Sequence, residues 1–192
     1  MNETEVTLSS VANLPSRHGP FKVQAFKEGH KEHLLIWTEN LACEAPLVRV
    51  HSECVTGDAL GSRKCDCGDQ LDQAMFLIQK AGCGAILYLR QEGRNIGLLN
   101  KINAYALQDQ GLDTVAANHQ LGFADDERSY EIAEFMLEHL GLKQIRLLTN
   151  NPNKLESFAK ITIAERVPLI VEPNEYNRGY LQTKKEKSGH LL

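Results

Sequence analysis

Polar and apolar residues alternate along much of the first fifty positions of the chain. This alternation is typical of half-buried β-strands. Proline and glycine residues, which favour turns, stand between the alternating segments. We therefore expect a β-rich N-terminal part with short strands within residues 5–14, 21–26, 33–40 and 46–53.

After Asp69 the period becomes that of an amphipathic helix, which Gly82 is placed to end. The residues expected on its buried face are Leu71, Ala74, Met75, Ile78 and Ala81. The apolar segment GAILYLRQ then predicts a buried strand. It is followed by the turn EGRNIG and by a helix over NKINAYALQDQG that Gly111 closes.

Residues 113–129 show little periodicity, and we expect a long loop there, of the kind that often carries function. The next segment, SYEIAEFMLEHLG, predicts a helix, and QIRLLTN predicts a strand. The helix residues expected to point inward are Tyr130, Ala133, Phe135, Met136 and Leu140.

Asn151 and Pro152 suit the N-cap and first turn of a helix over NKLESFAK, and ITIAERVPLIVEP predicts one or two further strands. The last twenty residues are polar and are expected to be extended or loosely attached. Strands followed by strand–helix alternation predict an α/β fold, a mixed β-sheet with flanking helices and a β-rich N-terminal part.

A chain of 192 residues is long enough for one sizeable core, so residues 1–192 are expected to form a single domain. No apolar run approaches the ~18 residues of a membrane span, and the N-terminal residues do not resemble a secretory signal. These features predict a cytoplasmic protein that does not contact a membrane. The net charge of -4 gives no general attraction for nucleic acid.

Three of the five cysteines lie close together in the sequence, at Cys54, Cys65 and Cys67. In a reducing compartment such a cluster favours metal ligands over disulfides. Three thiolates with an open fourth position are typical of catalytic zinc. A closed site completed by Cys43, Cys83 or His51, or no metal at all, remains an alternative, although Cys43 and Cys83 themselves are interpreted as buried free thiols.

A second candidate site is RQEGRNIGLLNK, where glycines and basic residues join a strand to a helix, as in a phosphate-binding loop. The alternative is an ordinary turn with solvated arginines. For DDERS (125–129) and for Thr149 to Lys154, an anion site competes with routine helix capping.

These segments together resemble one family. RVHSECVTGDALGSRKCDCG, the long stretch LYLRQEGRNIGLLNKINAYALQDQGLDTVAANHQLGF, DDERSY and RLLTNNPNK are similar to GTP cyclohydrolase II of riboflavin biosynthesis. The resemblance extends from about Leu14 to the C-terminal KSGHLL. It implies a hydrolase that opens a cyclic amidine of GTP and yields 2,5-diamino-6-(5-phosphoribosylamino)pyrimidin-4-one, formate and pyrophosphate, the first step of that pathway.

The resemblance also implies partners and site residues. It implies one Zn²⁺ per subunit on Cys54, Cys65 and Cys67, Mg²⁺ with the triphosphate, and a homodimer. The implied catalytic residues are Tyr105, Asp126 and Arg128. The implied substrate-binding residues are Arg49, Val50, His51, Ser52, Glu53, Gln70, Glu92, Gly93, Arg94, Thr114, Thr149 and Lys154.

Other functions compete with this one. A relative could stop at ring opening or keep the triphosphate, but Tyr105 and Arg128 are the groups that the later steps require. A non-enzymatic zinc module for nucleotides or nucleic acid is the other alternative, and the acidic net charge disfavours it. For Arg128, the family role of nucleophile on phosphorus competes with stabilisation of transition-state charge. Tyr105 could instead be a packed helix tyrosine.

Overall fold

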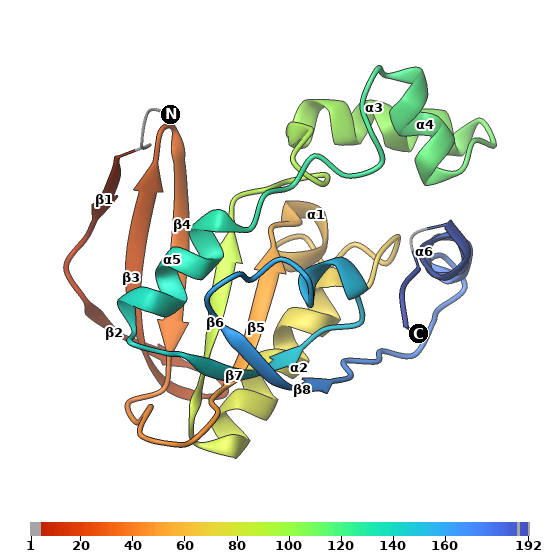
Figure 1. Cartoon of the computed structure of the whole chain (residues 1–192). Coiled ribbons are helices and arrows are strands. Elements are labelled where there is room, and N and C mark those ends of the chain that lie inside the picture. The colour runs from red at the N-terminus through yellow and green to blue at the C-terminus, as the bar shows by residue number, and fades with distance from the viewer. Residues whose placement is uncertain (1–4, 188, 192) are drawn as a thin grey trace.

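The computed structural model describes residues 5–187 and 189–191, and in them eight strands form one mixed sheet (Figure 1). The strands are β1 (Val6–Leu8), β2 (Ala12–Ser16), β3 (Gly19–Glu28), β4 (Lys31–Trp37), β5 (Leu47–Ser52), β6 (Gly84–Leu89), β7 (Gln144–Leu148) and β8 (Thr162–Val167). Their order is β1-β3-β4-β6-β5-β7-β8, with β2 paired to β3. β1 to β4 are antiparallel and β6, β5, β7 and β8 are parallel, which confirms the predicted mixed sheet.

One long helix covers each face of the sheet. α2 (Cys67–Ala81) packs Ala74 and Ile78 into one hydrophobic cluster. α5 (Glu131–His139) packs Ala133 and Met136 into the other, larger cluster. The two helices therefore enclose the sheet in a three-layer arrangement, and the strands between them are buried on both faces.

The connections of this sheet change direction at β5. The chain leaves β5, crosses through α2 and returns as β6 on one side, and after α5 it returns as β7 on the other side. Ligands of parallel α/β sheets bind beyond the carboxyl ends of the strands at such a reversal. The fold alone therefore indicates that the residues following β5, β6 and β7 form a ligand site.

The remaining helices lie around that edge. They are α1 (Val55–Asp58), α3 (Gly97–Asp109), α4 (Thr114–Gln120), the 3₁₀ turn η1 (Pro152–Lys154) and α6 (Arg178–Lys187). α3 and α4 project from the body of the sheet, and α6 lies beyond the same edge (Figure 1). No helix in the described residues is long and apolar enough to span a membrane.

Two of the predicted irregular segments are helical. The loop expected over 113–129 contains α4, because the Asp113 carboxylate caps it and accepts from the N–H groups of Val115 (2.9 Å) and Ala116 (3.2 Å). The polar tail expected to be loose contains α6, whose Leu181 is buried. Both predictions were wrong because short polar helices gain their stability from caps and tertiary contacts more than from periodicity.

Single positions on the long helices also differ from the pattern. Phe135 is 41% exposed, whereas Ile132 and Leu137 of the same helix are buried. Ala81 lies exposed at the end of α2. Asn151 caps a turn as expected, with its side chain accepting from the Asn153 N–H, but only the 3₁₀ turn η1 follows it.

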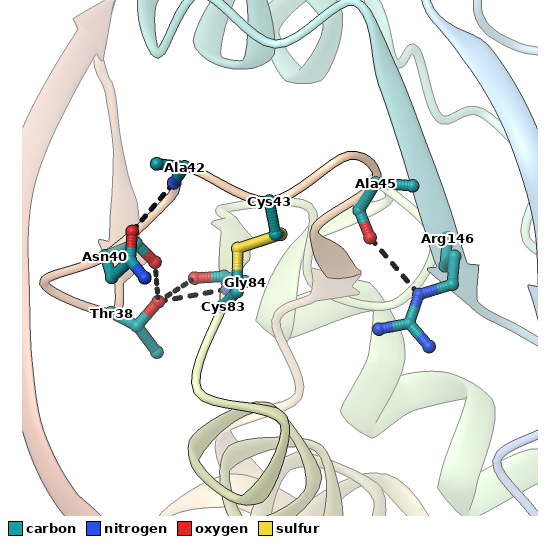
Figure 2. Close-up of a disulfide and its surroundings, with 8 residues drawn as sticks. All are labelled: Thr38, Asn40, Ala42, Cys43, Ala45, Cys83, Gly84 and Arg146. Atoms are coloured by element: carbon teal, nitrogen blue, oxygen red, sulfur yellow. Dashed lines mark hydrogen bonds between the residues drawn. A yellow bond between two sulfur atoms is a disulfide. The ribbon is translucent and has the colours of Figure 1, made fainter.

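The prediction of buried free thiols at Cys43 and Cys83 was wrong, because these residues form a disulfide (Figure 2). The pairing of β4 with β6, which places Trp37 opposite Ala85, brings the loop after β4 next to the residue before β6. The two Cα atoms lie 6.5 Å apart, within the range a disulfide spans. The bridge therefore ties a loop that contains the exposed Cys43 to the sheet.

Candidate active site

A pocket opens at the carboxyl ends of β5, β6 and β7. Most residues proposed from the sequence line it, although they come from widely separated segments. They are Arg49, His51, Ser52, Glu53, Cys54, Cys65, Cys67, Gln70, Glu92, Gly93, Arg94, Tyr105, Thr114, Arg128, Thr149 and Lys154.

Two of the proposed residues, Val50 and Asp126, do not line the pocket themselves. The Val50 side chain is fully buried in the core, and its carbonyl accepts from Lys154 Nζ at 2.8 Å. The Asp126 carboxylate binds the Arg128 side chain. Both residues can therefore affect the pocket through a neighbour that does line it.

The three clustered cysteines form the only group of potential metal ligands in the part of the chain that is described, with all sulfurs within 4.8 Å of one another. The sulfurs of Cys54 and Cys65 are 3.6 Å apart. Tetrahedral zinc–thiolate bonds of about 2.3 Å require sulfurs about 3.8 Å apart, so the Cys54–Cys65 separation is close to the one that zinc requires. Because all three cysteines line the pocket, the fourth position of such a site faces it.

Two glycines allow the cysteines to converge. A Cβ at Gly57 would lie 2.8 Å from the Cys65 sulfur and 3.2 Å from the Cys54 sulfur. A Cβ at Gly68 would lie 2.4 Å from the Gly57 carbonyl oxygen. α1 and the start of α2 can therefore approach each other only because both positions lack a side chain.

The thiols themselves share a negative charge. Hydrogen bonds from Cys65 and Cys67, helped by Lys101, hold the pKa of Cys54 far below its ordinary value. The bond to Cys54 raises the pKa of Cys65 to about 11, and that of Cys67 is also raised. One thiolate stabilised by two thiols is a donor set that a cation would complete by displacing the remaining protons.

Lys101 and Glu92 support this cluster from α3 and the loop before it. The Lys101 ammonium donates to the Cys54 sulfur (3.1 Å) and to Glu92 Oε1 (2.6 Å). The other Glu92 oxygen accepts from the Val55 N–H at 2.7 Å, at the start of α1. Glu92 thus links the two segments that meet at the cysteines.

His51 is not a fourth ligand in this arrangement. Its Nε2 lies 3.1 Å from both oxygens of Asp58, which also accepts from the N–H of Cys54 (2.9 Å) and the Tyr88 hydroxyl (2.8 Å). Burial lowers the pKa of His51 despite this carboxylate. Since Cys43 and Cys83 are bonded to each other, the closed four-ligand alternative finds no support among the described residues.

Tyr105 stands beside the thiolates on α3. Its hydroxyl lies 3.4 Å from Thr56 Oγ1, and the ammonium groups of Lys64 and Lys101 lie 5.2 and 5.7 Å from its ring centre. Burial raises the pKa of Tyr105. The phenol therefore keeps its proton and can donate it into the pocket.

Cationic side chains line the pocket near the ends of β5 and β7. Arg49 is held by the Leu148 carbonyl (3.1 Å) and by Gln70 Oε1 (2.5 Å). Burial, together with the charges of Arg49 and Arg128, lowers the pKa of Lys154 well below its ordinary value. A bound polyanion would raise the pKa of Lys154 again and would stabilise the charged forms of these closely packed side chains.

Arg128 is fixed by a two-pronged contact with Asp126. Its Nε donates to one carboxylate oxygen at 2.7 Å and its Nη2 to the other at 2.5 Å. Burial opposes the charge, but the Asp126 hydrogen bonds outweigh it and the pKa of Arg128 is raised. The guanidinium therefore remains protonated. Asp126 does not cap α5, whose N-cap position is Tyr130.

The loop after β6 has an unusual backbone. Gly93, Arg94 and Asn95 all adopt positive φ, at 62°, 61° and 77°. The conformation is costly for the two residues that are not glycine. It is held by side-chain contacts, since Arg94 donates to the Asp125 carbonyl (2.8 Å) and Asn95 to the Glu127 carbonyl (3.0 Å). This strained loop places Glu92 and Arg94 at the pocket.

Sequence reasoning missed two residues that line the pocket from α6, Tyr180 and Lys184. A signal existed, because Asn177, Tyr180, Leu181 and Lys184 recur with the spacing of one helical face. The high proportion of charged residues nearby obscured it.

Comparison with known proteins agrees with the site. The family model described as GTP cyclohydrolase II matches residues 7–168. Proteins named GTP cyclohydrolase-2 are similar over nearly the whole chain. That of Campylobacter hominis is 60% identical over 97% of this chain and 96% of its own, and that of Helicobacter pylori 56% over 96% and 97%. That of Escherichia coli is 56% identical over 94% of this chain and 95% of its own.

The chain belongs to the GTP cyclohydrolase II family. It is therefore an enzyme, a hydrolase that acts on GTP in riboflavin biosynthesis, as the sequence predicted. A solved structure shares the fold: RibBX, a two-domain 3,4-dihydroxy-2-butanone 4-phosphate synthase from A. baumannii, aligns with a TM-score of 0.50 at 16% identity. The alignment covers 89% of this chain and 42% of that longer one.

Membership of the GTP cyclohydrolase II family gives the pocket a substrate to accommodate. A purine nucleoside triphosphate needs a place for its ring and a place for several negative charges. The thiolate cluster with Tyr105 and the cationic group around Arg49 meet in one pocket, so one bound nucleotide can reach both.

Proposed function

We propose that this chain, as one GTP cyclohydrolase II domain over residues 1–192, hydrolyses GTP to 2,5-diamino-6-(5-phosphoribosylamino)pyrimidin-4-one, formate and pyrophosphate. The observation that carries the proposal is the presence of an open three-thiolate cluster and a buried cationic group in the same pocket. Zn²⁺ would be held by Cys54, Cys65 and Cys67, and Mg²⁺ would accompany the triphosphate. When bound, zinc supplies Lewis-acid activation of water at neutral pH.

The residues around the cluster have distinct tasks in this proposal. Tyr105, as a protonated phenol beside the thiolates, donates to the guanine ring as it opens. Lys101 donates to the Cys54 sulfur, which withdraws charge from that ligand. Three thiolates donate much charge to a metal, so a site of this kind requires a second group that withdraws charge.

At the other side of the pocket, Arg49 and Lys154 bind the triphosphate, with Gln70 orienting Arg49. Arg128 stabilises negative charge on the oxygens of the phosphoryl group whose bond is cleaved. Asp126 aligns the Arg128 guanidinium. The charged state of Arg128 favours this role over that of a nucleophile, because a protonated guanidinium has no lone pair to donate.

The experiment that tests the proposal is a product assay with purified protein, GTP, zinc and magnesium. We expect formate and pyrophosphate in equal amounts, and a pyrimidinone monophosphate by mass spectrometry. Cys54→Ser should abolish formate release, whereas Cys43→Ser, a control cysteine outside the pocket, should retain it. Absence of formate from the zinc-loaded protein would refute the function, and a product that keeps its triphosphate would indicate a relative that stops at ring opening.

We also propose a cytoplasmic location, from the N-terminal sequence and the lack of long apolar runs, and a homodimer, which the resemblance implies. α3 offers a surface for a second copy, since Leu98, Leu99 and Ile102 are 46%, 73% and 47% exposed. Sedimentation of the protein and of Leu99→Glu tests this: we expect a dimer that the substitution weakens, and a wild-type monomer at micromolar concentration would contradict it.

A further inference from the structure

The helix α6 is held beside the pocket by its own residues and by the segment that follows it. Before it, the Asn177 side chain is fully buried and accepts from the Asn174 N–H at 2.8 Å. Within it, Leu181 is 7% exposed. After it, the Leu191 N–H donates to the carbonyl of Asn150, a pocket residue, at 2.8 Å. These contacts hold α6 over one side of the pocket.

Lys184 extends from α6 into this pocket. Its ammonium donates to Asp66 Oδ1 at 2.8 Å and lies 4.4 Å from the ring centre of Tyr180, one turn earlier. The Lys184 side chain is 12% exposed and that of Asp66 only 2%. Asp66 takes one of the three N–H groups of the ammonium, which leaves donors for a ligand.

Asp66 connects Lys184, through Gln70, to Arg49, which is proposed above to bind the triphosphate. The other Asp66 oxygen accepts from Gln70 Nε2 at 2.5 Å, and Gln70 Oε1 accepts from Arg49 at 2.5 Å. Lys184, Asp66, Gln70 and Arg49 therefore form one continuous chain of hydrogen bonds. The position of the α6 ammonium is fixed relative to Arg49 by this chain.

The charges near this chain are unbalanced. Arg49, Arg128, Lys154 and Lys184 all line the pocket. Asp66 and Asp126 are the carboxylates that pair with them in the described residues. Burial of four basic side chains beside two carboxylates disfavours their charged forms, and lowers the pKa of Lys154, unless a ligand brings negative charge.

The pKa of Lys184 is shifted in the opposite direction from that of Lys154, although both side chains are buried. Burial and nearby cations lower the pKa of Lys154. The pKa of Lys184 is raised, because Tyr180 and Asp66 outweigh the cost of burial. Lys184 thus carries a full charge before any ligand binds.

We propose that Lys184 is a substrate-binding residue whose ammonium, delivered by α6 and held by Asp66, contacts the triphosphate, so that α6 is a wall of the GTP site. This inference rests on the proposed function, since it assigns a further residue to the same site.

The test compares Lys184→Gln and Lys184→Ala with the matched control Lys185→Ala, an exposed neighbour on the same helix. Calorimetry on zinc-loaded protein measures binding of inorganic tripolyphosphate and of guanosine, and steady-state assays give KM for GTP. We expect both Lys184 variants to weaken tripolyphosphate binding and raise KM by about tenfold or more. Guanosine affinity and zinc content should stay within about twofold of wild type in all variants, and Lys185→Ala should match wild type throughout.

Lys184→Gln separates charge from structure, because its amide keeps a donor for Asp66 without the positive charge. Recovery of tripolyphosphate binding in this variant, or unchanged binding in Lys184→Ala, overturns the proposal. Equal losses for guanosine and tripolyphosphate also overturn it, since the contact would then be with the nucleoside. If wild type releases no formate but Lys184→Gln still loses tripolyphosphate binding, GTP hydrolysis fails while the anion-binding role of Lys184 stands.

Discussion

At the scale of single residues, the two roles considered for Arg128 require different states of its guanidinium. Its paired contact with Asp126 keeps the guanidinium charged, so we expect charge, and not a phosphorus–nitrogen bond, to be what catalysis needs. Arg128→Lys should then retain about a tenth to a hundredth of kcat, whereas Arg128→Ala should lose about a thousandfold. Single-turnover release of pyrophosphate measures this.

A covalent intermediate on nitrogen predicts a different result for Arg128. Phosphate label from α-³²P GTP would then remain on wild-type protein after quenching in a neutral denaturant, since acid hydrolyses a phosphorus–nitrogen bond, and Arg128→Lys would be as inactive as Arg128→Ala. Asp126→Asn provides a matched control, because it keeps hydrogen-bonding atoms but removes the charge that orients the guanidinium. We expect it to lower kcat less than Arg128→Ala does.

A second residue, His33 of β4, makes the fold sensitive to pH. Its Nδ1 accepts from the Arg90 N–H at 3.0 Å, so neutral His33 carries its proton on Nε2. Burial, with Lys31 and Arg90 nearby, lowers the pKa of His33 from 6.5 to about 4. Because the unfolded chain takes up this proton at higher pH than the folded chain does, the stability contributed above pH 6.5 is lost as the pH falls towards 4.

We expect this histidine to account for up to about 3 kcal/mol of the loss in unfolding free energy between pH 7 and pH 4. Urea unfolding at several pH values measures it, and His33→Gln should show a correspondingly shallower loss. His139→Gln, at a partly exposed histidine on α5, should keep the wild-type slope. Identical slopes for wild type and His33→Gln would contradict the assignment.

At the scale of elements, the sequence predicts the helices and strands whose residue pattern is set by burial of one face. It does not predict the helices that depend on particular tertiary contacts. The five N-terminal strands overlap the four segments predicted from alternation, with β1 and β2 both overlapping the one over residues 5–14. The helices α2 and α5 follow from periodicity, because one face of each meets the core. α3 matches a predicted helix, although it projects from the sheet (Figure 1). The helices α4 and α6 do not, since their positions depend on Asp113 as a cap and on packing beside the pocket. The sequence shows neither contact.

The disulfide between Cys43 and Cys83 shows the same limit. Local sequence gives two apolar surroundings, and only the register of β4 against β6 brings the thiols together. Closing a loop with a sequence separation of 40 restricts the unfolded chain and contributes about 4 kcal/mol in the chain-entropy model. We expect Cys43→Ser to lower the unfolding free energy by up to that amount under non-reducing conditions, by urea denaturation.

Under a thiol reductant the difference between wild type and Cys43→Ser should disappear. Zinc content should be unchanged by the substitution, because the cluster lies in the pocket and the disulfide outside it. Titration of thiols in the denatured, metal-free protein supplies the direct check, with three expected before reduction and five after. Five free thiols before reduction would contradict the pairing.

At the scale of the whole molecule, the site could be identified from the sequence in parts and not as an assembly. Cys54, Cys65 and Cys67 are recognisable by spacing, but Arg128 and Lys154 join them only because β5, β6 and β7 end at one edge. The resemblance to a family supplied that assembly in advance. It supplied nothing about α6, and the physical pattern on that helix was too weak to replace it.

Metal removal tests how the cluster relates to the fold as a whole. Cys54 and Cys65 lie between β5 and α2, and Cys67 begins α2; none of the three belongs to the two hydrophobic clusters. We therefore expect a chelator to leave the sheet folded, with an unchanged far-UV circular dichroism spectrum, while the loop before Cys65 loosens. Arg63 and Lys64 of that loop are 60% and 44% exposed and become the preferred sites for trypsin.

Cleavage after Arg63 or Lys64 should accelerate about tenfold in the chelated protein and return to the original rate when zinc is added back. Cleavage after Lys31, the first residue of β4, is the internal control and should not change. Loss of the whole spectrum on chelation would mean that the metal holds the sheet together. Unchanged cleavage would mean that the hydrogen bonds that Asp58 and Glu92 accept and Lys101 donates suffice to hold α1 and the cysteines without the metal.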